Sequence, residues 1–267
     1  MIPKLKEVMT LLEKIAPVHS AEPWDNPGLQ VGSYSQEISK ILLALDPTVE
    51  SLRAASTRQA QLLLTHHPLI FEPLSRLDIN NYPGNVIIEA AKNEISIVAV
   101  HTNLDVSKGG INDILADLLD LQHVEALKER DEGDGFGLGR IGNLPEPLKL
   151  SVLTRNVKKI LGKEKLRVVG QKDLKIHRLA VVGGSGGSLL SLAFQKGADL
   201  LITGDVSHHH AREAQAMGIA LIDGGHFHTE RLPFRKFAER LNDALKAQGW
   251  EVAIEVDEDE TDPIRDD

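Results

Sequence analysis

An apolar run that stops abruptly at two adjacent histidines and a proline constrains the fold more than any other stretch. Residues 62–71 are Leu-Leu-Leu-Thr-His-His-Pro-Leu-Ile-Phe. Such a run is typical of a parallel strand that is buried on both faces of a sheet. Because Pro68 cannot donate to a neighbouring strand, the strand must end at or before it. His66 and His67 are therefore expected at the carboxyl end of a strand, where open α/β sheets bind their ligands.

The position of the two histidines relative to the strand decides whether both can bind one metal ion. Adjacent residues of a strand point to opposite faces of the sheet. The pair must therefore lie in the turn after the strand, or each histidine must bind a different metal ion. Taken alone, the pair fits two loop histidines bonded to the backbone equally well.

Two further predicted strands end in polar residues and alternate with predicted helices. Residues 41–46 are apolar up to Asp46, and residues 95–101 are largely apolar up to His101. Strands that alternate with helices imply βαβ units and a mostly parallel sheet. Residues 21–32 contain two prolines and two glycines and predict a structured loop, in which Trp24 either packs over the core edge or lines a cleft. Helical spacing of apolar residues predicts helices within residues 3–16, 47–60, 86–92 and 111–121.

The second half of the chain repeats the pattern of the first. Residues 179–184 match 41–46, and residues 200–205 match 62–67, both at an offset of 138 residues (179 − 41 and 200 − 62). Residues 219–223 resemble 97–101 at an offset of 122 (219 − 97). We therefore predict an α/β protein of two related lobes with mostly parallel or mixed sheets.

The predicted lobes comprise residues 1–127 and 128–250, and the polar, glycine-rich stretch 128–140 is the predicted boundary between them. The acidic residues 251–267 are predicted to form a solvated, mobile tail. Other elements of the second lobe are predicted as a helix at 148–161, a short strand at 166–170 and a helix at 232–247. That C-terminal helix either stays with the second lobe or packs back on the first.

Composition excludes several kinds of site and partner. The chain of 267 residues has no cysteine, which removes disulfides, thiolate zinc sites and cysteine nucleophiles. A net charge of −9 and an aromatic content of 4% disfavour binding to nucleic acid or to anionic lipid. No apolar run approaches the roughly 20 residues of a membrane helix, and the first residues do not resemble a signal peptide. We therefore expect a cytoplasmic protein without a membrane partner.

Histidines and carboxylates gather at the predicted strand ends, where eight of the chain's 11 histidines lie. His101 and Asp105, and likewise His226 and Glu230, are four residues apart, which places each pair on one face of a helix. Imidazole and carboxylate ligands without thiolate suit zinc, manganese, iron, nickel or cobalt. Five or six such ligands exceed the four of a structural zinc site and favour a site for two metal ions.

Metal ligation is the predicted role of five residues: His66, His67, Asp105, His226 and Glu230. His101 is either a further ligand or a residue that orients one. His208, His209, His210 and His228 are expected at the surface or in a cleft. Residues 183–187, Gly-Gly-Ser-Gly-Gly, are expected to form a tight turn between strand and helix rather than a phosphate site, because they lack the lysine and hydroxyl of a P-loop.

The chain resembles a known family along almost its whole length. The matching stretches, in the family's order, are residues 21–29, 65–68, 101–105, 139–142, 203–205 and 225–230. They are similar to the type 2 GTP cyclohydrolase-I-like family, also known as the NGG-interacting-factor-like family. The resemblance implies two α/β lobes with a dinuclear metal site in the cleft between them, and a ring-shaped homohexamer. Residues 121–157 leave no room for the inserted domain of some members, so the chain resembles the short form.

The resemblance also implies a reaction and its cofactors. Two divalent ions per chain would be held by the five predicted ligands, with Glu230 as the bridge. The implied reaction is hydrolytic opening of the guanine imidazole ring of GTP, which releases formate and gives dihydroneopterin triphosphate. A bound divalent ion lowers the pKa of water toward 7, which suits this chemistry, and His101 would be the general acid or base.

The phosphate contacts and the activity itself stay open at this stage. Arg140, Lys108 and Arg231 are the cations nearest the motifs that could hold the triphosphate of a small-molecule nucleotide substrate. The alternative to a hydrolase is a non-enzymatic metal-binding hexamer that acts as a scaffold, or that stores and delivers ions.

Overall fold

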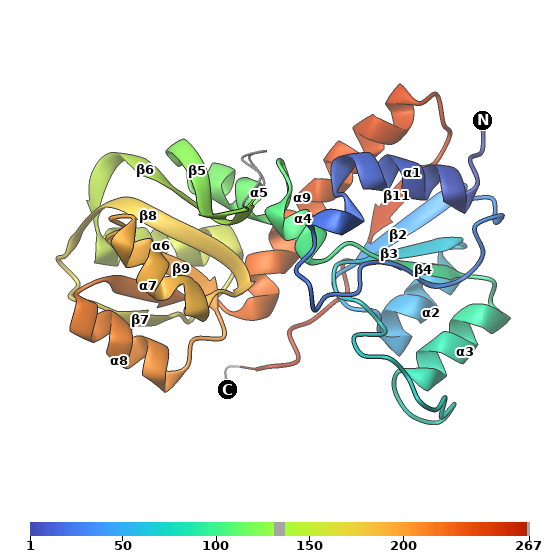
Figure 1. Ribbon diagram of the computed structural model, residues 1–267, viewed down its shortest axis with the longest axis horizontal. Coiled ribbons are helices and arrows are strands. Elements are labelled where there is room, and N and C mark those ends of the chain that lie inside the picture. Colours follow the sequence, from blue (N-terminus) through green and yellow to red (C-terminus); the bar gives the residue numbers. More distant parts are fainter. Residues whose placement is uncertain (131–136, 266–267) are drawn as a thin grey trace. The chain divides into compact units, whose positions relative to one another are not determined.

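The computed structural model describes residues 1–130 and 137–265, which form a mixed α/β protein with two sheets (Figure 1). The chain divides into two compact units. Unit 1 comprises Met1–Ser107 and Phe234–Thr261, and unit 2 comprises Lys108–Pro233 and the segment from Asp262 onward. The predicted fold class is confirmed, but the division lies 20 residues before the predicted boundary (127 − 107). The reason is that helix α5 (Ile111–Leu118) packs on strands β6 (Gly137–Lys149) and β8 (Lys175–Ser185) of unit 2.

Unit 1 is built on a five-stranded sheet in the order β1-β4-β3-β2-β11. All neighbouring strands are parallel except β1, which pairs antiparallel with β4 at the edge. β3 is the central strand and its three leucines are fully buried, as expected for an apolar run that is covered on both faces. The strands are β1 (Gly28–Val31), β2 (Lys40–Ala44), β3 (Leu62–Thr65), β4 (Ser96–Ala99) and β11 (Ala253–Val256).

Helices cover both faces of this sheet. α2 (Val49–Thr57) and α3 (Gly84–Lys92) share an apolar core with β2, β3 and β4 on one face. α1 (Leu5–Ile15) and the C-terminal part of α9 (His226–Ala247) lie on the other face (Figure 1). The short helix α4 (Thr102–Val106) follows β4, and the 3-10 turn η1 (Val18–Ser20) follows α1. Among the described residues, no helix is long and apolar enough to cross a bilayer.

Unit 2 is built on a six-stranded sheet in the order β5-β6-β8-β9-β10-β7. β8, β9 and β10 are parallel, whereas β5, β6 and β7 pair antiparallel with their neighbours. The remaining strands are β5 (Gln122–Glu129), β7 (Arg167–Val169), β9 (Leu200–Gly204) and β10 (Ala220–Asp223). The helical elements are α5, α6 (Leu150–Leu161), η2 (Gly187–Leu189), α7 (Leu190–Gln195), α8 (His208–Met217) and the first two turns of α9.

The glycine-rich stretch predicted as the boundary between lobes belongs to a strand pair. Glu129 of β5 pairs with Gly137 of β6, and residues 131–136 lie outside the described part of the chain. A Cβ atom on Gly137 would lie 2.5 Å from the carbonyl oxygen of Lys128. The glycine therefore permits close packing of two strands, and the predicted boundary is corrected accordingly.

The predicted repeat is visible in the topology of the two sheets. β2, β3 and β4 are adjacent and parallel, as are β8, β9 and β10, and the antiparallel strands β1 and β7 flank the corresponding edges. Ile41 pairs with Leu62, and Leu179 pairs with Leu200. These equivalent pairs agree with the offset of 138 residues.

The third strand of the repeat has a different register from the predicted one. Leu63 pairs with Ile97, and the equivalent Leu201 pairs with Leu221, so the offset is 221 − 97 = 124 residues rather than 122. A slip of two residues leaves every side chain on the same face of a strand. The apolar pattern alone could not reveal it.

The C-terminal stretch predicted as a solvated tail contributes a strand and two buried contacts. β11 extends the sheet along the edge of β2. Asp257, directly after β11, is buried and its Oδ1 lies 3.6 Å from Nη2 of Arg58. One carboxylate oxygen of Glu260 accepts two backbone N–H groups that follow β2, at 2.7 and 3.1 Å. The tail prediction is therefore wrong for residues 253–260, because β11 pairs with β2 and the side chains of Asp257 and Glu260 bond groups of unit 1.

Candidate metal centre

The sheet of unit 1 brings three histidines together because their strands end at the same edge. β2, β3 and β4 are parallel and in register, with Ala44, Thr65 and Ala99 as paired residues at their carboxyl ends. His66 and His67 follow β3 directly, and His101 follows β4. Both histidines of the adjacent pair thus lie in the turn after the strand, which is the condition under which they can face one centre.

The buried His66 and the half-buried His67 are held by oxygen acceptors. Nδ1 of His66 lies 2.8 Å from the carbonyl oxygen of Val100, and Nδ1 of His67 lies 2.7 Å from Oδ1 of Asp46. Because a carbonyl or carboxylate oxygen only accepts, each Nδ1 carries a proton. In the neutral form of such a ring the lone pair is on Nε2, which is the form that binds a metal ion.

His101 is held in the same way by Asp25, a residue that the sequence did not single out. Nδ1 of His101 donates to Oδ1 of Asp25 at 2.7 Å. The second oxygen of Asp25 accepts the backbone N–H of Thr102 at 3.0 Å and also its hydroxyl. Burial alone would raise the pKa of Asp25, but the hydrogen bonds from His101 and Thr102 and the charge of His101 lower it below its ordinary value. Asp25 is therefore a carboxylate at neutral pH.

The three imidazoles form a compact cluster within unit 1. Their ring centroids are 5.1 Å apart for His66 and His67, 5.2 Å for His66 and His101, and 5.4 Å for His67 and His101. One ring nitrogen from each lies within 4.8 Å of the others. The buried Asp105, on α4, places Oδ1 3.6 Å from Nε2 of His66. Imidazoles anchored through Nδ1, together with a carboxylate, fit a divalent transition-metal ion.

Unit 2 holds the other two predicted ligands at the start of α9. Nε2 of His226 lies 3.0 Å from Oε2 of Glu230, one helical turn later, and Glu230 is 3% exposed. Nδ1 of His226 lies 2.6 Å from Oδ2 of Asp205, which follows β9. Asp205 thus holds His226 as Asp46 and Asp25 hold the histidines of unit 1. A histidine and a buried carboxylate on one helical face are suitable donors for a divalent ion.

The glycine-rich residues 183–187 make room for Glu230. Gly184 lies at the end of β8 with φ +61°, and a Cβ atom there would be 2.1 Å from Oε1 of Glu230. Its backbone N–H donates to the hydroxyl of Thr229 at 3.0 Å, which ties the strand to α9. The stretch does connect a strand to a helical turn, as predicted, but Gly184 in it serves the close approach of the carboxylate.

The other strand-end residues of unit 2 have partners within the fold. Asp223 accepts from the guanidinium of Arg167 and, at 2.9 Å, from the backbone N–H of Gly225. Nδ1 of His228 lies 3.3 Å from the carbonyl oxygen of Leu161. Burial and the neighbouring Lys163 lower the pKa of His228. The three consecutive histidines begin α8 after the capping Ser207.

A cavity of about 440 Å³ in unit 2 opens beside His226 and contains three cations that the sequence reasoning missed. Lys163, Lys165 and Arg167 line it, at every second position of the segment that leads from α6 into β7. This spacing of cations was the signal available in the sequence. Three carboxylates line the same cavity: Asp205, Asp223 and Asp262.

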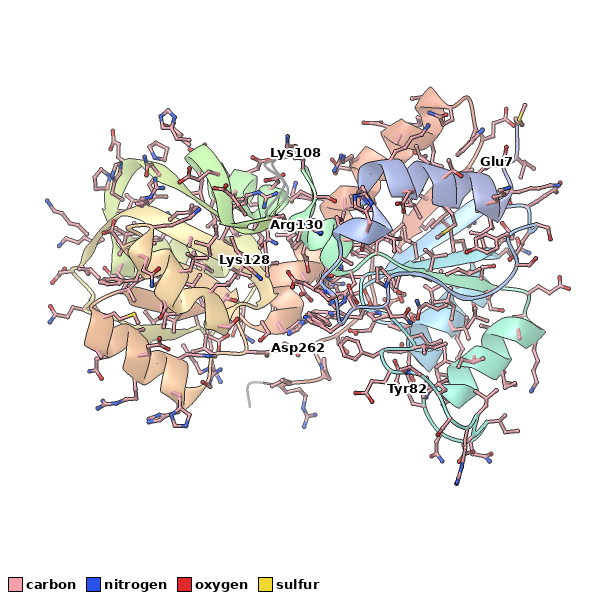
Figure 2. All side chains as sticks on the ribbon, in the orientation of Figure 1. Glu7, Tyr82, Lys108, Lys128, Arg130 and Asp262 are labelled. Atoms are coloured by element: carbon pink, nitrogen blue, oxygen red, sulfur yellow. The ribbon has the colours of Figure 1, made fainter. Side chains whose placement is uncertain are left out.

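The cations favoured from the sequence lie elsewhere in unit 2. Lys108, labelled in Figure 2, and Arg140 line a different cavity of about 590 Å³, where Arg140 pairs with Asp113. The guanidinium of Arg231 lies 5.5 Å from the ring centroid of Phe227. Neither arrangement places these cations in the cavity beside His226.

Comparison with known proteins finds relatives that match almost the whole chain. The chain is 35% identical over 261 residues to a GTP cyclohydrolase 1 type 2 homolog of Clostridium perfringens, with 98% of each chain covered. It is 36% identical over 251 residues to a GTP cyclohydrolase 1 type 2 of Helicobacter pylori, covering 94% of this chain and 95% of that one. The crystal structure of a Bacillus cereus protein related to NIF3 superposes with a TM-score of 0.92 at 28% identity, over 99% of both chains.

These alignments cover nearly all of this chain and nearly all of each of the three relatives, so this chain has no large inserted domain relative to them, as expected for the short form. The sequence model of Duf34/NIF3 (NGG1p interacting factor 3) matches residues 3–263, which include every candidate ligand described above. The chain therefore belongs to the Duf34/NIF3 family.

Proposed function

We propose that the protein is a dinuclear, divalent-metal-dependent hydrolase that acts on a nucleotide such as GTP. The observation that carries the proposal is the cluster of His66, His67 and His101, each with Nδ1 anchored on an oxygen acceptor. Such anchoring fixes the tautomer and the direction of a metal-binding imidazole. The proposed ligands are the predicted ones: His66, His67, Asp105, His226 and Glu230.

The donors of both units are proposed to serve the same pair of ions. A catalytic site retains an ion with about three protein ligands, and His226 with Glu230 supplies only two. Glu230 has two carboxylate oxygens, so it can bridge two ions. When bound, such ions would lower the pKa of water toward neutrality and polarise the substrate.

His101 is the proposed proton-transfer residue, and Asp25 is its positioning residue. Asp25 has a buried carboxylate, and it fixes the orientation of the ring to which it is bonded through Nδ1. Nε2 of His101 would then take up and release a proton beside the ions. His101→Gln should abolish most turnover while metal content is retained; loss of metal with turnover would instead make His101 a ligand.

The cavity beside His226 is the proposed seat of the substrate phosphates. Lys163 and Lys165 supply positive charge there, beside Arg167, which pairs with Asp223, and lysine and arginine are the usual phosphate-binding side chains. Lys165→Ala should raise KM for GTP without changing metal content. Lys172→Ala, which removes an exposed lysine that does not line the cavity, is the matched control.

The relatives support the same reaction class. The Helicobacter pylori relative carries the name GTP cyclohydrolase 1 type 2, and we propose for this chain the corresponding ring opening with release of formate. The alternative is a metal-binding assembly without turnover, and the same histidine cluster would serve it equally well.

One experiment separates these functions. Protein purified without chelator should contain two divalent ions per chain by elemental analysis and should release formate from GTP. His67→Gln should lose metal and turnover together, whereas His209→Gln, an exposed histidine of α8, should lose neither. Full metal content without turnover across nucleotides and phosphoesters would establish the non-enzymatic alternative, and absence of bound metal would refute both.

A further inference from the structure

Two large aromatic side chains are exposed to solvent beside the histidine cluster of unit 1. Trp24 is 56% exposed and Phe71 is 50% exposed. Their ring centroids are 5.7 Å apart at an interplanar angle of 42°. The ring of Trp24 also meets His101 edge-on, with centroids 5.9 Å apart. The pair therefore presents an aromatic surface in contact with a candidate metal-site histidine.

The fold holds this aromatic pair in place through the residues next to it in sequence. Asp25, which follows Trp24, is fully buried and bonds His101 and Thr102. Nδ2 of Asn26 donates to the carbonyl oxygen of Ile70 at 2.6 Å. The backbone N–H of Ile70 in turn donates to the side chain of Gln30 at 3.0 Å. The two loops are thus tied together, and the aromatic rings are exposed on a fixed backbone.

Two exposed aromatic rings on a fixed backbone leave apolar surface in contact with water, and a bound ligand that covers them gains the free energy of burying it. A flat heteroaromatic ring is the ligand that such a surface recognises best, since it can stack on an aromatic face whatever its substituents. Contact with His101 places any such ring next to the atoms proposed for chemistry. A sugar phosphate without a base has no flat heteroaromatic ring to stack on these side chains.

We propose that Trp24 and Phe71 form a stacking site for the base of a nucleotide substrate, with a purine as the expected ring. This inference rests on the proposed nucleotide hydrolase and names the part of the chain that recognises the base. Trp24 is thereby assigned to a ligand surface, the second of the two roles expected for it from the sequence.

Fluorescence tests the site directly, because the chain has only two tryptophans. In a Trp250→Phe variant the remaining signal comes from Trp24. Addition of GTP to the metal-loaded protein should quench this signal, whereas inorganic triphosphate and ribose 5-phosphate should leave it unchanged. An unchanged signal with bound GTP would overturn the stacking site. A signal that follows protein concentration instead of GTP would place the pair in a contact between copies and would also overturn it.

Variants supply the second measurement. Trp24→Leu and Phe71→Leu should each weaken GTP binding about tenfold, measured by equilibrium binding at low temperature. Metal content and the affinity for inorganic triphosphate should stay unchanged. Phe194→Leu, which removes a 46%-exposed phenylalanine from α7 of unit 2, is the control and should bind GTP normally. Unchanged GTP affinity in both loop variants would contradict the proposal.

Turnover distinguishes failure of the stacking site from failure of the proposed function. If GTP quenches Trp24 and the leucine variants bind GTP tenfold more weakly, but no formate is released, the stacking site stands and the proposed hydrolase function is refuted. If formate is released but GTP does not quench Trp24, and Trp24→Leu leaves KM for GTP unchanged, the proposed hydrolase function stands and the stacking site is refuted.

Discussion

At the residue scale, the carboxylate of Glu230 is the predicted ligand whose burial most requires a positive partner. Glu230 is buried, and it lies against a glycine that has no room for a side chain. A buried carboxylate is expensive unless it is paired with positive charge. His226 supplies one partner, and divalent ions bridged by Glu230 would add further positive charge.

We therefore expect Glu230→Gln to lose metal while the fold stays intact. The amide keeps the shape of the side chain but removes the negative charge that attracts the ions. Elemental analysis should show loss of at least one ion per chain, and circular dichroism should match that of the unaltered protein. Glu213→Gln on α8, whose carboxylate bonds Ser191, is the control. Unchanged metal content would exclude the bridging role.

Gly184→Ala should destabilise the protein and impair metal binding. The positive φ alone costs about 1–2 kcal/mol for alanine, and the added Cβ would lie 2.1 Å from Oε1 of Glu230. Gly162→Ala is a matched control, because Gly162 has φ +65° and no atom within 4 Å of a Cβ. Urea unfolding should therefore show strain in both variants, but only Gly184→Ala should bind metal more weakly. Equal metal affinity would mean that the carboxylate moves away freely.

The ligand candidates could be proposed from the sequence, but the residues that hold them could not. His66 and His67 stand out because an apolar run ends at them. Asp25 bonds His101 across 76 positions of the chain, and its local context shows only a loop. Such partners depend on which strand ends meet at one sheet edge, which is information of the tertiary fold.

At the element scale, most of the strands found from sequence were those buried on both faces, and the largely exposed β7 (predicted at residues 166–170) was the exception. β2, β3 and β4 consist almost entirely of buried residues. β5 and β11 are mostly exposed or half-buried, and β6 contains two prolines and three glycines. Such strands lack a continuous apolar run, and backbone pairing with a neighbour places them in the sheet. The missed strands are therefore the ones whose stability comes from the partner strand.

The contact between the segment after β11 and the end of β2 should make stability depend on pH. Burial, opposed by two backbone hydrogen bonds, raises the pKa of Glu260 from 4.5 to about 7. The folded protein then binds a proton more tightly than the unfolded chain. This stabilisation is fully present below pH 4.5 and is lost as pH rises through about 7.

Glu260→Gln should remove this dependence, because the amide cannot ionise. Compared with the unaltered protein, the variant should gain in free energy of unfolding between pH 5 and pH 8, measured by urea denaturation. Glu258→Gln, which removes an exposed carboxylate paired with Arg235, should follow the unaltered protein. Parallel pH curves for Glu260→Gln and the unaltered protein would show that Glu260 titrates normally in the fold.

At the scale of the whole molecule, the segment between β3 and α3 exposes several large apolar side chains to solvent. Leu74, Leu77, Ile79 and Tyr82 (the last labelled in Figure 2) are each between 42% and 59% exposed. Asp78 in the same segment accepts hydrogen bonds from Asn80 at 3.0 Å and Asn81 at 2.7 Å. A clustered apolar surface on such a braced loop is typical of a protein–protein contact.

The homohexamer implied by the family resemblance offers a cover for this surface. We expect sedimentation to give six times the mass of one chain. Leu77→Asp with Ile79→Asp should dissociate the assembly, because charges buried in an apolar contact are strongly disfavoured. Phe194→Asp, also an exposed apolar position but on α7, should leave the mass unchanged. If the double variant keeps the full mass, another surface joins the copies, and if the unaltered protein sediments as a single chain, the hexamer is refuted.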